Sequence, residues 1–198
     1  MPFTFCHPAI ILPLSKSQKL STSALIFGST APDFEYFLRM DMIRTHSHDF
    51  WAMFYFNLPL TLGLFFIFQS IVKVPLINNL PHFLFSRFSR FIITKPNYTT
   101  VTSIFWICLS AIIGIFSHLL WDSFTHKEGF FEGYFSFLLQ EFYFMGKSRI
   151  VFQFLQMISS ILGGGYMIYF VFKIPKQYTP KKKQYINIGF SLSYFLFL

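Results

Sequence analysis

Three long apolar runs divide the chain and predict membrane-spanning helices near residues 50–72, 103–122 and 150–172. Each run holds about 20 residues with few charges, which is enough helix to cross a hydrocarbon core of about 30 Å. A last apolar run, residues 186–198, is too short to cross. We interpret it as part of a fourth, truncated span. The pattern therefore predicts an all-α, polytopic membrane helix bundle that forms one domain over residues 1–198.

The amino-terminal part, residues 1–49, has a different pattern. Small residues between positions 20 and 31 would permit close helix packing. Pro32 then interrupts the run, and Asp33 and Glu35 would be costly in lipid. We therefore expect an interfacial or re-entrant segment rather than a span. Asp33 could also cap the following helix, a role that is compatible with a functional one.

Composition and charge agree with a membrane protein. Hydrophobic residues make up 54% of the 198 residues and charged residues only 12%, whereas a soluble domain has about 25% charged residues. The net charge of +8 comes from short basic clusters between apolar runs, as expected beside a membrane. The charge thus indicates the lipid bilayer as partner and no nucleic acid. Two separate cysteines make no disulfide framework.

The second predicted span carries a polar stripe. His118, Asp122 and His126 follow one another at intervals of four residues, so on a helix they share one face. Polar residues at the rim of a membrane helix suggest function, and imidazole with carboxylate is a usual ligand set for metals. Alternatively, His118 and Asp122 hydrogen-bond each other between helices, and His126 complements the dipole at the helix end.

Further candidate ligands lie before the first span. His46 and His48 are two residues apart and do not share a helix face, which favours a loop. Three spans place residues 1–49 and the connection 123–149 on the same side of the membrane. The acidic residues and histidines of these segments then converge at one membrane face with the polar stripe. Lysine and arginine number seven on that side and nine on the other, so the positive-inside rule places the site on the non-cytoplasmic face.

Four stretches carry a resemblance to a known family. They are Met-Pro-Phe-Thr-Phe-Cys-His-Pro-Ala at 1–9, Gly-Ser-Thr-Ala-Pro-Asp-Phe-Glu-Tyr-Phe at 28–37, Asn-Leu-Pro-Leu at 57–60 and Ser-His-Leu-Leu-Trp-Asp-Ser-Phe-Thr-His at 117–126. Over nearly the whole chain they resemble the domain of unknown function four-one-eight-four, a family of bacterial integral membrane proteins. The resemblance implies a location in the bacterial inner membrane but carries no activity. Members of that family usually extend beyond residue 198.

The same landmarks are similar to a more distant group of inner-membrane proteins described as metal-dependent hydrolases. That group shows an early His, a Gly-x-x-x-Pro-Asp turn, a Thr-His-Ser element and a Ser-His-x-x-x-Asp helix. The resemblance implies a metal site formed by His7, Asp33, either His46 or His48, His118 and Asp122. In the nearer family a His stands nine residues before Asn-Leu-Pro, which selects His48. A glycine that is usual four residues later is Ala52 here.

Two functions remain as hypotheses. The first is a metal-dependent hydrolase of a membrane-borne ester or phosphoester, with zinc, manganese or iron as the divalent metal. Glu35 or His126 would accept and return the proton. The second is a non-catalytic membrane protein in which the same residues staple helices or bind metal or lipid headgroups. Metal transport is disfavoured because polar groups gather at one face and leave the middle of the spans largely apolar. The sequence does not select an oligomeric state.

Overall fold

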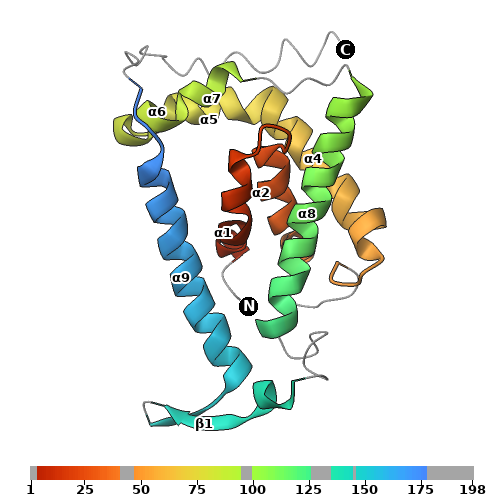
Figure 1. Cartoon of the computed structure of the whole chain (residues 1–198), viewed down its shortest axis with the longest axis vertical. Helices are drawn as coiled ribbons and strands as arrows, with labels where there is room; N and C mark the ends of the chain where they lie inside the picture. Colours follow the sequence, from red (N-terminus) through yellow and green to blue (C-terminus); the bar gives the residue numbers. More distant parts are fainter. Residues whose placement is uncertain (1–3, 41–46, 95–99, 126–134, 145, 178–198) are drawn as a thin grey trace.

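The structure, a computed structural model, describes residues 4–40, 47–94, 100–125, 135–144 and 146–177. Among these residues three helices are long and apolar enough to cross a membrane: Met53–Asn79, Val101–Thr125 and Val151–Lys173 (Figure 1). The predicted all-α membrane architecture with three spans is therefore confirmed. The predicted partial fourth span, 186–198, lies outside the described residues.

The first span is longer and less regular than predicted. It joins a π-helix, η4 (Met53–Asn57), to α4 (Leu58–Ile67), a second π-helix, η5 (Phe68–Val72), and α5 (Lys73–Asn79). The apolar pattern placed its end at residue 72, before the charge of Lys73. The helix continues because the buried Lys73 ammonium donates hydrogen bonds to Gln69 Oε1 at 2.7 Å and Thr94 O at 2.5 Å.

Short elements cover the two ends of the bundle. At one end α6 (His82–Phe88) and α7 (Arg90–Ile93) lie beside α5, across the top of Figure 1. At the other end a 3₁₀ turn, η6 (Ser136–Leu139), leads into strands β1 (Glu141–Phe144) and β2 (Lys147–Ile150). The strands pair antiparallel, with Glu141 opposite Ile150. The sequence pattern predicted only a connection over residues 123–149, so this pair of strands is a difference from the prediction.

The amino-terminal part forms a helical hairpin that lies among the spans. Its first arm contains η1 (Thr4–Cys6), α1 (Pro8–Ile11) and η2 (Leu12–Lys16). Its second arm contains α2 (Thr22–Thr30), η3 (Ala31–Asp33) and α3 (Phe34–Arg39). The hairpin is red in Figure 1. Its first arm lies against α8 (Val101–Thr125) and α9 (Val151–Lys173), and its second arm lies against α8 and α4. The interfacial placement of residues 1–49 stays a prediction, to which the structure adds this hairpin.

The tip of the hairpin reaches the end of α8 that is remote from Asp122. The Ser21 N–H donates to Ser110 Oγ at 2.9 Å, and the Lys19 ammonium lies 5.3 Å from the centre of the Trp106 ring. Since a helix rises about 1.5 Å per residue, Trp106 lies about 24 Å from Asp122 along α8. The first arm thus runs from one end of the bundle to nearly the other, and the second arm returns.

Two glycines set how closely α2 and α8 pack. A Cβ atom on Gly28 would lie 2.4 Å from Ala111 O, and one on Gly114 would lie 2.3 Å from Leu25 O. No larger residue fits either position unless the helices separate, so the backbones themselves are in contact. Beside this contact a small core forms from Ala24, Phe65 and Ile107. The close approach brings the end of α2 against the polar stripe of α8.

Candidate metal centre

Four of the predicted metal ligands meet at one end of the bundle. Asp33 ends η3, His48 lies in the loop before η4, and His118 and Asp122 lie in the last turns of α8. One ligand atom from each of these four residues lies within 4.8 Å of all the others. A group of His and Asp side chains that could hold a metal ion is therefore present.

The shortest distances join imidazole nitrogens to carboxylate oxygens. His118 Nε2 lies 3.5 Å from both Asp33 Oδ1 and Asp122 Oδ2. His48 Nε2 lies 3.3 Å from Asp122 Oδ2 and 3.7 Å from Asp33 Oδ1. All of these exceed the usual 2.7–3.2 Å of an N–H···O hydrogen bond. Both Nε2 atoms are buried and have no hydrogen-bond partner among the described residues.

The orientation of His118 is set by the backbone of α2. Its Nδ1 lies 2.8 Å from Ser29 O. A carbonyl oxygen can only accept, so Nδ1 carries a proton, and Nε2 is the nitrogen directed at the two carboxylate oxygens. In the neutral ring Nε2 would offer its lone pair to a cation at the common point, in the manner of metal-bound histidines whose second nitrogen donates to a carbonyl.

His48 is held by a chain of hydrogen bonds through its neighbour. Ser47 Oγ lies 2.9 Å from His48 Nδ1, and the Ser47 N–H donates to Glu35 Oε2 at 2.9 Å. The Ser47 carbonyl accepts from Asn57 Nδ2 at 2.7 Å. The N–H and the C=O of Ser47 are thus both fixed, the N–H by α3 and the C=O by the start of the first span. The His48 side chain is 12% exposed, against 5% or less for the other three ligands, so access to the group is along His48.

Asp33 is prepared to act as a carboxylate ligand. Thr4 Oγ1–H donates to Asp33 Oδ2 at 2.6 Å, which leaves Oδ1 directed at the two histidines. Burial by itself would raise the pKa of Asp33, but the His118 and His48 imidazoles and the Thr4 hydroxyl hold that pKa well below its usual range. Asp33 is therefore ionised throughout the neutral range.

The fifth predicted ligand, His7, lies beside this four-residue group. Its ring stacks on His118 with centroids 3.9 Å apart, and its Nε2 lies 3.6 Å from Asp122 Oδ1. Asp122 thus presents Oδ2 to the other histidines and Oδ1 to His7. The structure buries His7 against His118 and Asp122 and does not include it among the four ligand atoms that lie within common reach.

The residues present fit a divalent metal. Zn–N and Zn–O bonds of about 2.0–2.2 Å put neighbouring ligand atoms roughly 3–4 Å apart, and the four measured distances of 3.3, 3.5, 3.5 and 3.7 Å fall in that range. Two carboxylates and neutral imidazoles carry a charge of about −2, which a divalent ion would neutralise. The donor set admits zinc, manganese or iron and does not choose among them.

The other predicted residues have different surroundings. Glu35 is buried, and its second oxygen, Oε1, lies 3.0 Å from Arg39 Nε. His46 and His126 lie outside the described residues. A further histidine, His82, is exposed at the start of α6, at the opposite end of the bundle from the four-residue group.

Sequence reasoning missed the residues that hold the ligands. Thr4, Ser29 and Ser47 act through a hydroxyl, a carbonyl and a peptide group, and nothing in their residue types marks them in advance. Asn57 did carry a signal, because a buried amide within an apolar span requires a partner. The structure shows that this partner is the Ser47 carbonyl.

Comparison with known proteins gives a family and no activity. No curated protein and no solved structure matches the chain. The family described as Domain of unknown function (DUF4184) matches residues 1–197, nearly the full length. The predicted likeness to metal-dependent hydrolases has no further support from these comparisons. The chain therefore belongs to the DUF4184 family.

Proposed function

We propose that the protein is a metal-dependent hydrolase that acts on a membrane-borne ester or phosphoester. One observation carries this proposal. Two buried Nε2 atoms and two carboxylate oxygens face one another at 3.3–3.7 Å, longer than usual hydrogen bonds and at the spacing of ligands around one ion. The four atoms belong to three segments distant in the sequence, so the group is a product of the fold.

The chain's own residues would hold and orient the ion. Asp33, His48, His118 and Asp122 would be its ligands, and Ser29 and Thr4 would fix the two that lie deepest. A bound divalent metal would supply Lewis-acid chemistry by polarising an ester oxygen and lowering the pKa of water toward neutrality. The partial exposure of His48 would provide the approach for water and for the bond to be cleaved.

Glu35 and His126, the residues predicted for proton transfer, are not among the four ligands. Glu35 accepts the Ser47 N–H and pairs with Arg39, which supports a role in positioning His48. His126 lies outside the described residues. Proton transfer by either residue stays a prediction.

A second function is supported by the ligand count. Four protein ligands around a tetrahedral zinc ion would complete its coordination, as in structural sites. The same group would then staple the amino-terminal hairpin, the His48 loop and α8 together without catalysis. An ion that accepts five or six ligands, such as manganese or iron, would keep positions open for water and substrate.

The basic residues support an orientation in the membrane. Lys16 and Lys19 are exposed at the hairpin tip, at the end of the bundle remote from the metal group. Moving these two lysines to the other side changes the sequence-based count from seven against nine to five against eleven. By the positive-inside rule this count supports our proposal that the metal group faces the non-cytoplasmic side of the bacterial inner membrane.

Metal content and hydrolysis together test the proposal. We expect detergent-purified protein to retain about one divalent ion per chain and to hydrolyse a lipid ester or phosphoester in mixed micelles. Asp122→Asn should lose both properties, and His82→Ala should retain both. Metal retention without hydrolysis of any lipid ester or phosphoester would favour the stapling function. Absence of metal in the wild type would contradict both.

A further inference from the structure

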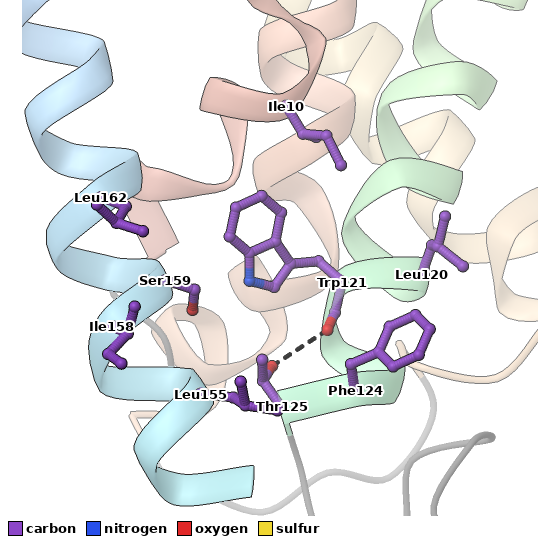
Figure 2. Close-up of a pocket in the computed structure, with 9 residues that line it drawn as sticks. All are labelled: Ile10, Leu120, Trp121, Phe124, Thr125, Leu155, Ile158, Ser159 and Leu162. Carbon is purple, nitrogen blue, oxygen red and sulfur yellow. Dashed lines mark hydrogen bonds between the residues drawn. The ribbon is translucent and has the colours of Figure 1, made fainter. Parts of the chain in front are cut away.

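An apolar groove lies between α8 and α9 beside the metal group. Its volume is about 480 Å³, which falls within the range of small-molecule sites. We call it the α8–α9 groove, and Figure 2 shows its lining: Ile10, Leu120, Trp121, Phe124, Thr125, Leu155, Ile158, Ser159 and Leu162. Both helices are candidate spans, so the groove would open toward the interior of the bilayer.

The lining offers an occupant almost no hydrogen bonds. The two hydroxyl groups in it are already engaged with their own helices, Thr125 Oγ1–H with Trp121 O at 3.2 Å and Ser159 Oγ–H with Gln156 O at 3.1 Å (Figure 2 shows the first). The remaining lining side chains are aliphatic or aromatic. Such a groove suits a hydrocarbon chain, and within a bilayer the abundant hydrocarbon is the acyl chain of a lipid.

The Trp121 side chain lies between the groove and the metal group. The edge of the Trp121 ring meets His7 with centroids 6.0 Å apart, and Asp122 follows it in α8. Ile10 lines the same groove from the helix that His7 precedes. The Trp121 indole nitrogen lies on the side of the ring turned toward Ser159, and no described residue accepts a hydrogen bond from it. An N–H donor therefore lies within the lining of an otherwise apolar groove.

We propose that the α8–α9 groove binds the acyl chain of the substrate, which makes the substrate a lipid with an ester or phosphoester at its polar end. This inference rests on the proposed hydrolase function. The Trp121 N–H would meet a polar oxygen where the chain joins the headgroup. In the reaction the oxygen of water forms a bond to the acyl carbon or phosphorus, and the bond to the leaving oxygen breaks. One water proton passes to that leaving oxygen and the other to solvent.

Adjacent residues of α9 provide a matched pair of variants. Leu162 lines the groove and is 66% exposed, and Ile161 does not line it and is 67% exposed. Leu162→Trp would fill the groove, whereas Ile161→Trp would add the same side chain elsewhere on the helix. Neither residue belongs to the metal group, so both variants should retain metal.

Photo-crosslinking tests chain binding independently of turnover. The full chain would be reconstituted in vesicles of phosphatidylethanolamine and phosphatidylglycerol with a trace of phosphatidylcholine that carries a diazirine on one acyl chain. We expect cross-links on groove residues, reduced by about tenfold in Leu162→Trp, which corresponds to lost burial of about two methylene groups. Ile161→Trp should cross-link as the wild type does. Equal cross-linking in the two variants would overturn the inference.

Turnover separates this inference from the function on which it rests. Leu162→Trp should raise KM for a long-chain ester by about tenfold and leave a short, water-soluble ester unaffected. Groove-specific cross-linking without hydrolysis of either ester would retain the acyl groove and contradict the hydrolase function. Hydrolysis of both esters with equal KM in the two variants would retain the hydrolase and overturn the groove.

Discussion

Replacing Gly114 by alanine tests whether close packing of α2 and α8 sets the metal geometry. The new Cβ would lie 2.3 Å from Leu25 O and 2.8 Å from Ser29 N. Ordinary van der Waals contact begins near 3.4 Å, so the two backbones would have to separate by about 1 Å. The obstacle is backbone, which cannot turn aside as a flexible side chain could.

The displacement would reach the metal group directly. The Ser29 carbonyl that orients His118 lies one residue from the Gly28 contact, and the 3.5 Å distance from Asp33 to His118 spans the same two segments. Metal sites tolerate deviations of about 0.2 Å in their ligand distances, so a shift of about 1 Å is several times too large. We expect metal affinity to fall by about 10–100-fold and unfolding free energy to fall by about 1–3 kcal/mol from overpacking.

The assay compares two glycine variants in detergent. Metal content would be measured by mass spectrometry after dialysis against a weak chelator, and stability by thermal unfolding with excess metal. Gly63→Ala is the control, because its Cβ would meet nothing within 4 Å and alanine favours a helix interior by roughly 0.5–1 kcal/mol. Wild-type metal affinity in Gly114→Ala would refute the reasoning, since it would show that the ligands do not depend on this packing.

Three other predictions concern the loop, the pH dependence and the orientation. Glu35→Ala removes the acceptor of the Ser47 N–H, so metal affinity should fall by about 10–100-fold with helical content unchanged in circular dichroism; an unchanged affinity in a chelator competition would show that Glu35 does not position the loop. Metal content should fall as the pH is lowered, because protons compete with the metal for the imidazole nitrogens. Asp33 does not cause this loss. Because folding lowers the pKa of Asp33, its carboxylate stabilises the fold fully above the unfolded-state pKa of about 3.9, and this contribution is lost only as the pH falls below that value toward the folded-state pKa. Metal loss and unfolding should therefore occur in separate pH ranges, and their coincidence would contradict this account. In a cysteine-free chain, Lys19→Cys and Phe137→Cys should react with an impermeant maleimide from opposite sides of the membrane, and labelling of both from one side would exclude the proposed hairpin orientation.

The sequence by itself determined the membrane class, the three spans and the convergence of the candidate ligands at one end of the bundle. Apolar length is a local property, so a run of residues predicts a span without knowledge of its neighbours. The four-residue spacing of His118 and Asp122 is equally local, because it places both on one face of α8. Two spans separate residues 1–49 from the connection 123–149, so both segments were predicted on one side of the membrane. This prediction put Asp33 and His48 at the same end of the bundle as Asp122, where the structure has them.

Only the tertiary structure decided how these residues are held and what lies beside them. The Ser29 carbonyl and the Ser47 N–H are backbone groups that every residue has, so their roles depend on which segment lies opposite. The α2–α8 contact, the hairpin tip at the far end and the α8–α9 groove are likewise relations between helices. The apolar pattern of one helix indicates that its surface is covered by protein or by lipid. It does not indicate which segment covers that surface or at what distance. Those distances determine whether four polar side chains form one metal site, and they are set by packing between segments distant in the sequence.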